Sequence, residues 1–157
     1  MKIRFCQEGD RAEVNRLLYQ STVIHSAGVP DFFIPLEESI NEKIYAEILS
    51  ADDQVLFCAE NEDGVLCGVL CGVCHLSFHN RSGWVEMKNV HVENIVVDET
   101  CRGQGIGHAL MAEAEHIAKE WGAVQLNLMC WHFNDGARRL YESLGMTEQR
   151  SILVKEL

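Results

Sequence analysis

Residues 95–110 read IVVDETCRGQGIGHAL, and this stretch decides the fold. An apolar strand ends at Val97, and a long amphipathic helix follows after a short loop. The loop holds Gly103, Gly105 and Gly107, which allow a ligand to approach the backbone without obstruction by Cβ atoms. The start of the helix adds unpaired N–H groups and a partial positive charge. The combination is typical of a binding site for phosphate or pyrophosphate.

Arg102 stands at the edge of this loop and can add a charge-assisted hydrogen bond to an anion. A tight strand-to-helix turn without a ligand is the alternative interpretation, because glycine reports backbone geometry first. The spacing is G-x-G-x-G rather than the dinucleotide pattern G-x-G-x-x-G, and it follows at least four expected strands instead of the first. No Gly-Lys-Ser/Thr sequence closes the loop, so it is not a P-loop.

The remaining elements are read from hydrophobic periodicity and from helix caps, in the order strand, two helices, three strands, helix, strand, helix, strand. Strands are expected over Lys2–Cys6, Gln54–Glu60, Val65–His79, Trp84–Val97, Val124–Met129 and Ser151–Val154. Turns are expected at 62–64 and 80–83. The pattern predicts one α/β domain over residues 1–157, with a mixed, mostly antiparallel sheet flanked by helices on both faces.

Capping residues predict where the helices begin. Asp10 with Glu13 and Ser39 with Glu42 form two capping boxes, and Asn134 is a third N-cap. The expected core-facing helix residues are Val14, Leu17 and Leu18, then Ile40, Ile44 and Ile48, then Ile106, Leu110, Ala114, Ile117 and Trp121, and finally Ala137, Leu140, Tyr141 and Leu144. The segment 25–35 holds both prolines and is expected to be irregular.

Composition excludes several classes of function. The formal net charge is −11 and the pI is near 5.0, which argues against binding to nucleic acid or to an anionic membrane surface. The same charge would attract a cationic substrate. The cysteine count is odd, at 7, no signal-like start is present, and no apolar run reaches the ~18 residues of a membrane span. We therefore expect a reduced, cytoplasmic protein.

The cysteine-rich stretch 67–79 has the spacing C-x-x-C, which zinc sites use. The stretch reads as one continuous strand, in which Cys71 and Cys74 point to opposite faces. No second C-x-x-C pair exists, so no metal site is expected.

Two motifs resemble those of the GCN5-related N-acetyltransferases, the GNAT family. Arg102-x-x-Gly105-x-Gly107 resembles the R/Q-x-x-G-x-G/A signature of that family. Asn134-x-x-Ala137-x-x-Leu140-Tyr141-x-x-x-Gly145, which begins 27 residues beyond Gly107, is similar to its N-x-x-A-x-x-L-Y-x-x-x-G-F segment. The order of elements agrees over essentially the whole chain. Two positions depart from the family pattern: Glu99 stands where proline is usual, and Met146 where phenylalanine is usual.

The resemblance implies acetyl-CoA as acyl donor and no metal. It implies that the strand ending at Val97 is bulged and splays from its neighbour, with the pantetheine arm in the gap. The Ile95 amide would polarise the thioester carbonyl, and the Tyr141 hydroxyl would lie near the sulfur. The implied cofactor contacts are Ile95, Val96, Val97, Arg102, Gly103, Gln104, Gly105, Ile106, Gly107, His108, Asn134 and Tyr141.

Acetyl transfer to an amine needs a base for the amine and an acid for the leaving thiolate. Strand alternation would place His91 and Glu93 on one face with Ile95 and Val97, provided that the bulge falls no earlier than Ile95. Glu93 is the favoured base, His91 its alternative or partner and Glu86 a distant third, and Tyr141 is the candidate acid. A hydrogen-bonded or solvated polar side chain is the plain alternative for each of them.

The predicted function is transfer of an acetyl group from acetyl-CoA to a primary amine, by direct attack within a ternary complex. A small cationic amine suits the acidic chain. A protein N-terminus or a lysine side chain is the alternative acceptor, and a non-catalytic acyl-CoA sensor is the alternative class. Paired aromatics in the 25–35 segment and in 131–133 are candidate walls of the acceptor pocket or the cofactor tunnel, or simply cover the core. A homodimer is the usual expectation for a soluble oligomer.

Overall fold

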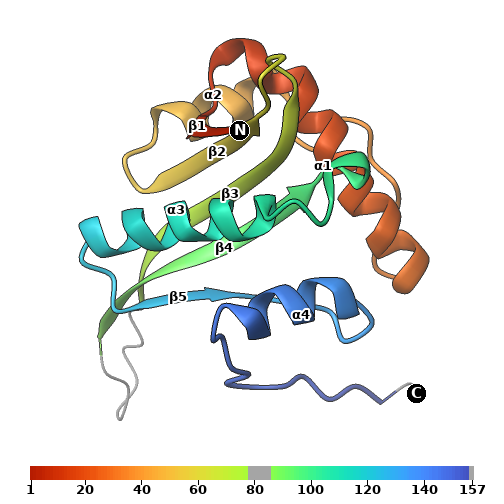
Figure 1. Cartoon of the computed structure of the whole chain (residues 1–157). Coiled ribbons are helices and arrows are strands. Elements are labelled where there is room, and N and C mark those ends of the chain that lie inside the picture. Colours follow the sequence, from red (N-terminus) through yellow and green to blue (C-terminus); the bar gives the residue numbers. More distant parts are fainter. Residues whose placement is uncertain (78–85, 156–157) are drawn as a thin grey trace.

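Five strands form one sheet whose spatial order follows the chain (Figure 1). The computed structural model describes residues 1–77 and 86–155. Its elements are β1 (Lys2–Phe5), η1 (Glu8–Asp10), α1 (Arg11–Gly28), α2 (Glu42–Ser50), β2 (Gln54–Glu60), β3 (Leu66–Ser77), β4 (Met87–Val97), η2 (Glu99–Cys101), α3 (Ile106–Glu120), β5 (Gln125–Leu128) and α4 (Asp135–Ser143). Strands β1 to β4 pair antiparallel and β5 pairs parallel to β4, so the expected mixed, mostly antiparallel sheet is confirmed.

The sheet has a hydrophobic core on each face. One core packs α1 and α2 against the sheet through Val14, Leu17, Leu18, Tyr45, Cys58, Val69 and Val96. The other packs α3 through Phe57, Leu70, Val92, Ile106, Leu110 and Ala114. Gly68 on β3 allows α3 to come close, because an added Cβ would lie 3.0 Å from the Ile106 side chain and from the Val96 carbonyl oxygen. Helices therefore cover both faces, as predicted.

Strand β4 carries one extra residue at Glu93. In the register with β3, Cys71 is opposite Asn94 while Gly72 is opposite Val92, so Glu93 has no partner and forms a β-bulge. The bulge changes which residues face which core. Val92 belongs to the α3 core, whereas Val96 belongs to the α1 core.

This bulge makes one prediction wrong. Ile95 and Val97 pack against the α3 core together with Val92, and they do not share a face with His91. The strict alternation that the prediction assumed fails because the bulge falls before Ile95. Glu93 and Asn94 instead line a cavity on the side of α1 and α2.

Strands β4 and β5 pair over only part of their length. The ladder joins Asn89–Val92 to Gln125–Leu128, and β5 ends there. Within the described chain, residues 94–97 of β4 are paired through β3 alone. A gap between the two parallel strands therefore opens at the bulge.

Asp98, at the end of β4, fastens α1 to the loop before α3. Its carboxylate, 6% exposed as a residue, accepts from Arg16 and, at 3.2 Å, from Gln20 on α1. It also accepts from the backbone and side chain of Thr100, at 3.0 and 2.6 Å. The bonds from Thr100 and Arg16 hold the pKa of Asp98 well below its usual range. The buried charge is thus satisfied from both elements that it joins.

Two predicted capping boxes are wrong in detail. Asp10 makes no cap of α1; its carboxylate accepts from Arg4 and from the Gln7 amide at 2.7 Å. Helix α2 is capped by Asn41, whose Oδ1 accepts from the Ile44 amide at 2.9 Å, rather than by Ser39. At Asp10, the Arg4 guanidinium and the Gln7 amide bind the carboxylate that was expected to cap α1. At α2, Asn41 caps the helix in place of Ser39. The spacing of residues in the sequence reveals neither contact. Asn134 caps α4 as predicted.

Helix boundaries differ in one further place. Helix α1 continues to Gly28, so the first residues of the segment 25–35 are helical rather than irregular. On α2 the buried residue is Tyr45, whose hydroxyl donates to the Gln7 carbonyl at 2.7 Å, while Ile44 is 42% exposed. The spacing of isoleucines predicted that Ile44 faces the core, but the larger Tyr45 side chain occupies that position.

The predicted strand Ser151–Val154 is not formed. Residues 147–155 form no helix or strand, and they run past α4 toward the C-terminus (Figure 1). The predicted turn at 80–83 and the ends of the flanking predicted strands, His79 and Trp84, lie outside the described residues. Among the helices of the described part of the chain, none combines the length and apolar character required to cross a bilayer.

Replacing Asp98 by Asn tests the fastening of α1. We expect D98N to lower the free energy of unfolding at pH 7 by about 2 kcal/mol, because the buried carboxylate loses its charge-assisted bonds and the half-exposed Arg16 keeps only Glu13 as an ionic partner. The folded pKa of Asp98 is depressed, so its stabilisation is present above the unfolded pKa near 3.9 and is lost as pH falls below it. The difference from wild type should therefore shrink between about pH 4 and pH 2.

Urea unfolding at pH 7 and pH 3 measures this difference. The matched control is D52N, at an exposed aspartate, which should unfold like wild type at both values. A D98N protein as stable as D52N at pH 7 would show that the ion pair contributes nothing.

Candidate active site

The glycine loop and the first turn of α3 form a cradle of backbone N–H groups. Gly103 and Gly105 have φ values of +77° and +80°, which only glycine adopts without strain. An added Cβ at either position would meet no atom within 4 Å, so backbone conformation rather than packing requires glycine there. The first turn of α3 has no side-chain cap and no acidic residue. Its N–H groups are therefore available to an anion.

Several predicted contact residues use their side chains elsewhere. The Ile106 side chain is 3% exposed in the α3 core, and Val96 is 5% exposed in the α1 core. The His108 ring lies 2.9 Å from the Ser143 hydroxyl on α4. Ile106 and Val96 can therefore offer only their backbone to a ligand in this arrangement, whereas the exposed His108 ring is tied to α4. Arg102 lies over the end of β4, where its Nε donates to the Val97 carbonyl at 3.3 Å.

Helix α4 packs closely against the start of α3. An added Cβ on Gly107 would lie 2.9 Å from Leu140 Cδ2, so this glycine is explained by helix packing. Asn134 Oδ1 accepts from the Ala137 amide at 3.2 Å, which uses the oxygen of its side chain for capping. Both residues thus have a structural role beside any contact with a ligand.

A cavity of about 230 Å³ opens at the bulge, between β4 and helices α1 and α2. Its walls are mostly aliphatic, with the Glu93 carboxylate and a few small polar side chains among them. The lining residues are Leu18, Thr22, Ser39, Ile40, Ile44, Ile48, Cys71, Glu93 and Asn94. One carboxylate among aliphatic and small neutral polar side chains is an arrangement that can hold and deprotonate an ammonium group.

Cys71 lies directly against Glu93. Its Sγ is 3.8 Å from Glu93 Oε2 and can donate a weak hydrogen bond to it. Burial and the charge of Glu93 raise the pKa of Cys71 to about 12, so the thiol stays protonated. The thiol therefore orients the carboxylate without competing with it for a proton.

His91 is held by a polar row across β4 and β5. Its Nδ1 lies 2.6 Å from Asn127 Oδ1, and Asn127 Nδ2 donates to Asn89 Oδ1 at 3.2 Å. With Asn127 donating to Asn89, its carbonyl oxygen accepts from His91, so Nδ1 carries the proton in the neutral ring. Nε2 is then the basic nitrogen of His91.

Tyr141 lies on α4, beyond the end of β5, with its side chain largely removed from water. Burial, together with the nearby Cys130 thiol, raises the pKa of Tyr141 to about 12. The phenol is therefore protonated at neutral pH and can act as a hydrogen-bond donor or an acid.

An aromatic cluster joins the end of α1 to the loop before α4. His25 stacks on Phe33 with ring centroids 5.1 Å apart and meets Phe133 at 6.2 Å. Trp131 lies 5.6 Å from Phe32 and 5.7 Å from Phe33. The two segments that the sequence offered as pocket or tunnel walls are thus in contact with each other.

Gly28 makes this contact possible. An added Cβ at Gly28 would fall 2.3 Å from the Phe133 ring, so a side chain there would displace the ring. Burial lowers the pKa of His25, which favours the neutral ring in this stack.

Sequence reasoning missed three features of the site. It did not find the aliphatic wall on α2, the Cys71 thiol against Glu93, or the support of His91 by Asn127. Only Asn127 had a usable signal, since it alternates with two leucines in β5 and so had to face away from the α3 core. The other two depend on where the bulge falls.

A second group of potential ligand atoms lies away from this site. Cys6, Asp10 and Cys58 place one ligand atom each within 4.8 Å of one another. The Asp10 carboxylate is occupied by the Arg4 guanidinium at 2.7 Å. That ion pair lowers the pKa of Asp10 and raises that of Arg4. The group is accounted for as a buried ion pair beside two thiols.

Comparisons with known proteins agree with this geometry. A family model described as the acetyltransferase (GNAT) family matches residues 23–146. The thialysine N-epsilon-acetyltransferase of Bos taurus is 32% identical over 102 residues, which make up 65% of this chain and 53% of that protein. The chain spans about half the length, or less, of the curated relatives it matches, at 56%, 53% and 32%.

Two solved structures extend the likeness over the whole chain. The tetramutant of the BH1408 protein from Bacillus halodurans has a TM-score of 0.93 and 25% identity, with 100% of each chain covered. An aminoglycoside N-acetyltransferase solved in complex with CoA has a TM-score of 0.73 and 20% identity, with 99% of each chain covered, and this likeness shows the fold. The match to the family model covers most of the chain, and the chain belongs to the GNAT acetyltransferase family.

Proposed function

We propose that this chain is an N-acetyltransferase that moves the acetyl group of acetyl-CoA to the primary amine of a small molecule. The observation that carries this proposal is the Glu93 carboxylate, set by the β-bulge into the wall of a cavity of about 230 Å³. The cavity lies at the point where β4 and β5 part. Donor and acceptor would meet there from opposite sides of the strand.

The donor side suits a diphosphate and an extended arm. The α3 N-terminus, the two left-handed glycines and Arg102 form a positive cradle in a chain of net charge −11. Glu93 precedes Val97 by four residues, about 13 Å along a strand, so a pantetheine arm in the gap would reach the bulge. Acetyl-CoA supplies the acyl group as an activated thioester. The family and the CoA-bound neighbour support this donor.

Two protons leave the nitrogen of the acceptor and one reaches the sulfur of the donor. Glu93 takes the first proton from the bound ammonium, directly or through water. The amine nitrogen then bonds to the carbonyl carbon and loses its second proton to water, the carbon–sulfur bond breaks, and the Tyr141 hydroxyl gives its proton to the departing sulfur and regains one from water. His91, with Nε2 as its basic nitrogen, is the partner or alternative base. The Ile95 amide is the proposed donor to the carbonyl oxygen.

The cavity favours a small acceptor with an apolar body. At about 230 Å³ it is smaller than the ~300–1,000 Å³ pockets of drug-sized ligands. Its aliphatic walls leave Glu93 as the one charged group, so one ammonium with a short hydrocarbon arm fits better than a polyamine. A protein N-terminus would need an open groove. A silent acyl-CoA sensor would leave both Glu93 and Tyr141 without a role.

Replacing Glu93 by Gln tests the base. We expect E93Q to lower kcat by about 10²- to 10⁴-fold, with the affinity for acetyl-CoA unchanged, because the cavity shape and the donor cradle remain. Chromatographic detection of free CoA with a panel of amines gives the rate, since the protein's own cysteines would react with a thiol dye. The control is E62Q, at an exposed glutamate in the turn after β2. An E93Q enzyme as fast as E62Q would assign the base elsewhere, with H91Q as the next variant.

The residues that line the cavity predict which amines have the higher kcat/KM. Monoamines with a short aliphatic arm should have a higher kcat/KM than diamines of the same length. Replacing Ile44 by Asp should reverse that order, since a second ammonium then finds a counter-charge, and a change of about 10- to 100-fold is reasonable for one pocket contact. A matched panel of butylamine, diaminobutane and their longer homologues provides the measurement. Equal rates in wild type and I44D would place the acceptor outside this cavity.

Replacing Gly105 by Ala tests the cradle. The left-handed φ of +80° should cost about 1 kcal/mol of stability with an alanine, and the shifted N–H groups should weaken binding of CoA by about tenfold. Thermal unfolding and titration calorimetry with CoA measure the two effects. The control is G136A, in the first turn of α4, where an added Cβ meets only one atom within 4 Å and the helix should be unchanged or slightly more stable. Unaltered CoA affinity in G105A would separate this loop from donor binding.

A further inference from the structure

Strand β3 contains a second β-bulge, at Cys67. In the register with β2, Glu60 is opposite Leu66 while Ala59 is opposite Gly68, so Cys67 is the extra residue and has no partner in β2. Leu66 packs in the α1 core, whereas Cys67, 5% exposed, packs in the α3 core. The bulged residue therefore buries a thiol on the side of the sheet that carries α3.

Cys101 reaches the same place from the loop before α3. The Asp98 amide donates to the Cys67 carbonyl at 2.9 Å, and the Cys101 amide donates to the Asp98 carbonyl at 2.9 Å. The single turn η2 thus folds Cys101 back toward the start of β3, where it packs against the α3 core that contains Cys67. The two thiols are hydrogen-bonding partners, and burial together with this contact raises the pKa of Cys67 to about 11. Two cysteines that are distant in the sequence therefore meet directly before the glycine loop.

The turn that carries Cys101 also sets the start of the glycine loop. Arg102 follows Cys101 directly, and its Nε donates to the Val97 carbonyl at 3.3 Å. The left-handed Gly103 is the next residue. A shift of Cys101 relative to β3 would therefore move the loop to which we assign the diphosphate of the donor, a step that rests on the proposed function.

Exposure distinguishes this pair from another close pair of thiols. The Sγ atoms of Cys6 and Cys58 lie within 4.8 Å of each other, but these residues are 5% and 0% exposed. Cys101 is only half-buried, so an oxidant in water reaches it without opening of the fold. Redox-sensitive cysteines combine such access with a second thiol that resolves the first oxidation product.

We propose that Cys67 and Cys101 form a site of reversible oxidation, at which hydrogen peroxide closes a disulfide that weakens the binding of acetyl-CoA. The peroxide O–O bond breaks, and the Cys101 thiol becomes a sulfenic acid with release of one water. The Cys67 sulfur then bonds to the Cys101 sulfur, the S–O bond breaks, and the Cys67 proton leaves with the hydroxyl as a second water. The two thiols lose two electrons, and the peroxide gains them.

The disulfide weakens donor binding because it moves η2. Two sulfur atoms in hydrogen-bonding contact must approach to about 2.05 Å when they bond, so Cys101 moves toward β3 and the adjoining glycine loop follows. The N–H groups of that loop then lie out of place for the diphosphate, and we expect the affinity for acetyl-CoA to fall by about tenfold.

Peptide mapping by mass spectrometry, after treatment with hydrogen peroxide, tests for the disulfide. Wild type should lose the mass of two hydrogen atoms and give a linked peptide pair that contains Cys67 and Cys101. C101S should give no linked pair. The matched control is C130S, at another half-buried cysteine, which should still form it. A linked Cys6–Cys58 pair in its place, or no linked pair, would overturn the proposal.

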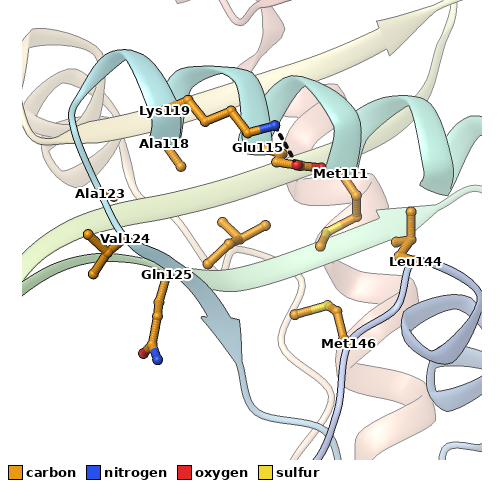
Figure 2. A pocket seen from close by; sticks show the side chains of 10 residues that line it. Met111, Glu115, Ala118, Lys119, Ala123, Val124, Gln125, Leu144 and Met146 are labelled. Carbon is orange, nitrogen blue, oxygen red and sulfur yellow. Dashed lines mark hydrogen bonds and ion pairs between the residues drawn. The ribbon is translucent and has the colours of Figure 1, made fainter.

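Methionine oxidation is the competing effect of a peroxide. Figure 2 shows Met111 and Met146 pointing into a groove of about 250 Å³ between α3, β5 and the chain that leaves α4. A methionine sulfoxide adds the mass of one oxygen atom and persists in dithiothreitol, whereas dithiothreitol reduces a disulfide. The loss of affinity that dithiothreitol restores is therefore the effect of the disulfide.

Titration calorimetry with acetyl-CoA measures that effect, since the free thiol of CoA would itself reduce the disulfide. The Kd should rise about tenfold on oxidation of wild type and C130S, return in dithiothreitol, and stay constant in C101S. An unchanged Kd in the linked protein, or the same reversible rise in C101S, would overturn the proposal. Reduced wild type that fails to bind acetyl-CoA would overturn the proposed function and with it the effect on binding, while the peptide map reports the disulfide independently.

Discussion

The extra residue at Glu93 is the constraint on which the site depends. Before it, Val92 faces the α3 core, and after it Val96 faces the α1 core. A regular strand would turn Val96 toward α3 and present Ile95 and Val97 to α1 instead. One residue therefore decides which side of β4 packs on which helices, and it leaves Glu93 unpaired at the turning point.

The position of the bulge is maintained because β4 is held in place both before and after Glu93. Before the bulge, β4 is paired on both sides, with β3 and with β5. After it, β4 is paired with β3 alone, and Asp98 closes the strand by binding Arg16 and Gln20 of α1. The same carboxylate shapes the turn through Thr100, so the loop that leads to Gly103 is held by the helix that walls the cavity. The glycine loop and the cavity are thus connected through one buried carboxylate.

The sequence predicted features that arise from local chemistry. The glycine loop, the long helix after it and the Asn134 cap all follow from backbone preferences within a few residues, and the structure has each of them. The two capping boxes near Asp10 and Ser39 failed because a competing partner lay close by, in Arg4 for the first and in the neighbouring Asn41 for the second.

Features that depend on pairing between distant strands could not be predicted. The position of the bulge is a property of the β3–β4 register, and neither strand reveals it alone. Glu93 does line a cavity, but the bulge places it there rather than alternation along the strand. The contact of Gly28 with Phe133 joins segments more than a hundred residues apart, and only the folded chain shows why glycine stands there.

The short length of β5 affects both the gap beside β4 and the stability of the sheet edge. It ends at Leu128, opposite Val92, and so opens the gap along residues 93–97 in which we place the pantetheine arm. A longer β5 would pair with those residues and close the gap. Yet a strand of four residues, paired on one side only, buries little surface and is weakly held. The length of β5 is therefore a compromise, because each further residue paired with β4 would stabilise the sheet edge and narrow the gap in which we place the pantetheine arm.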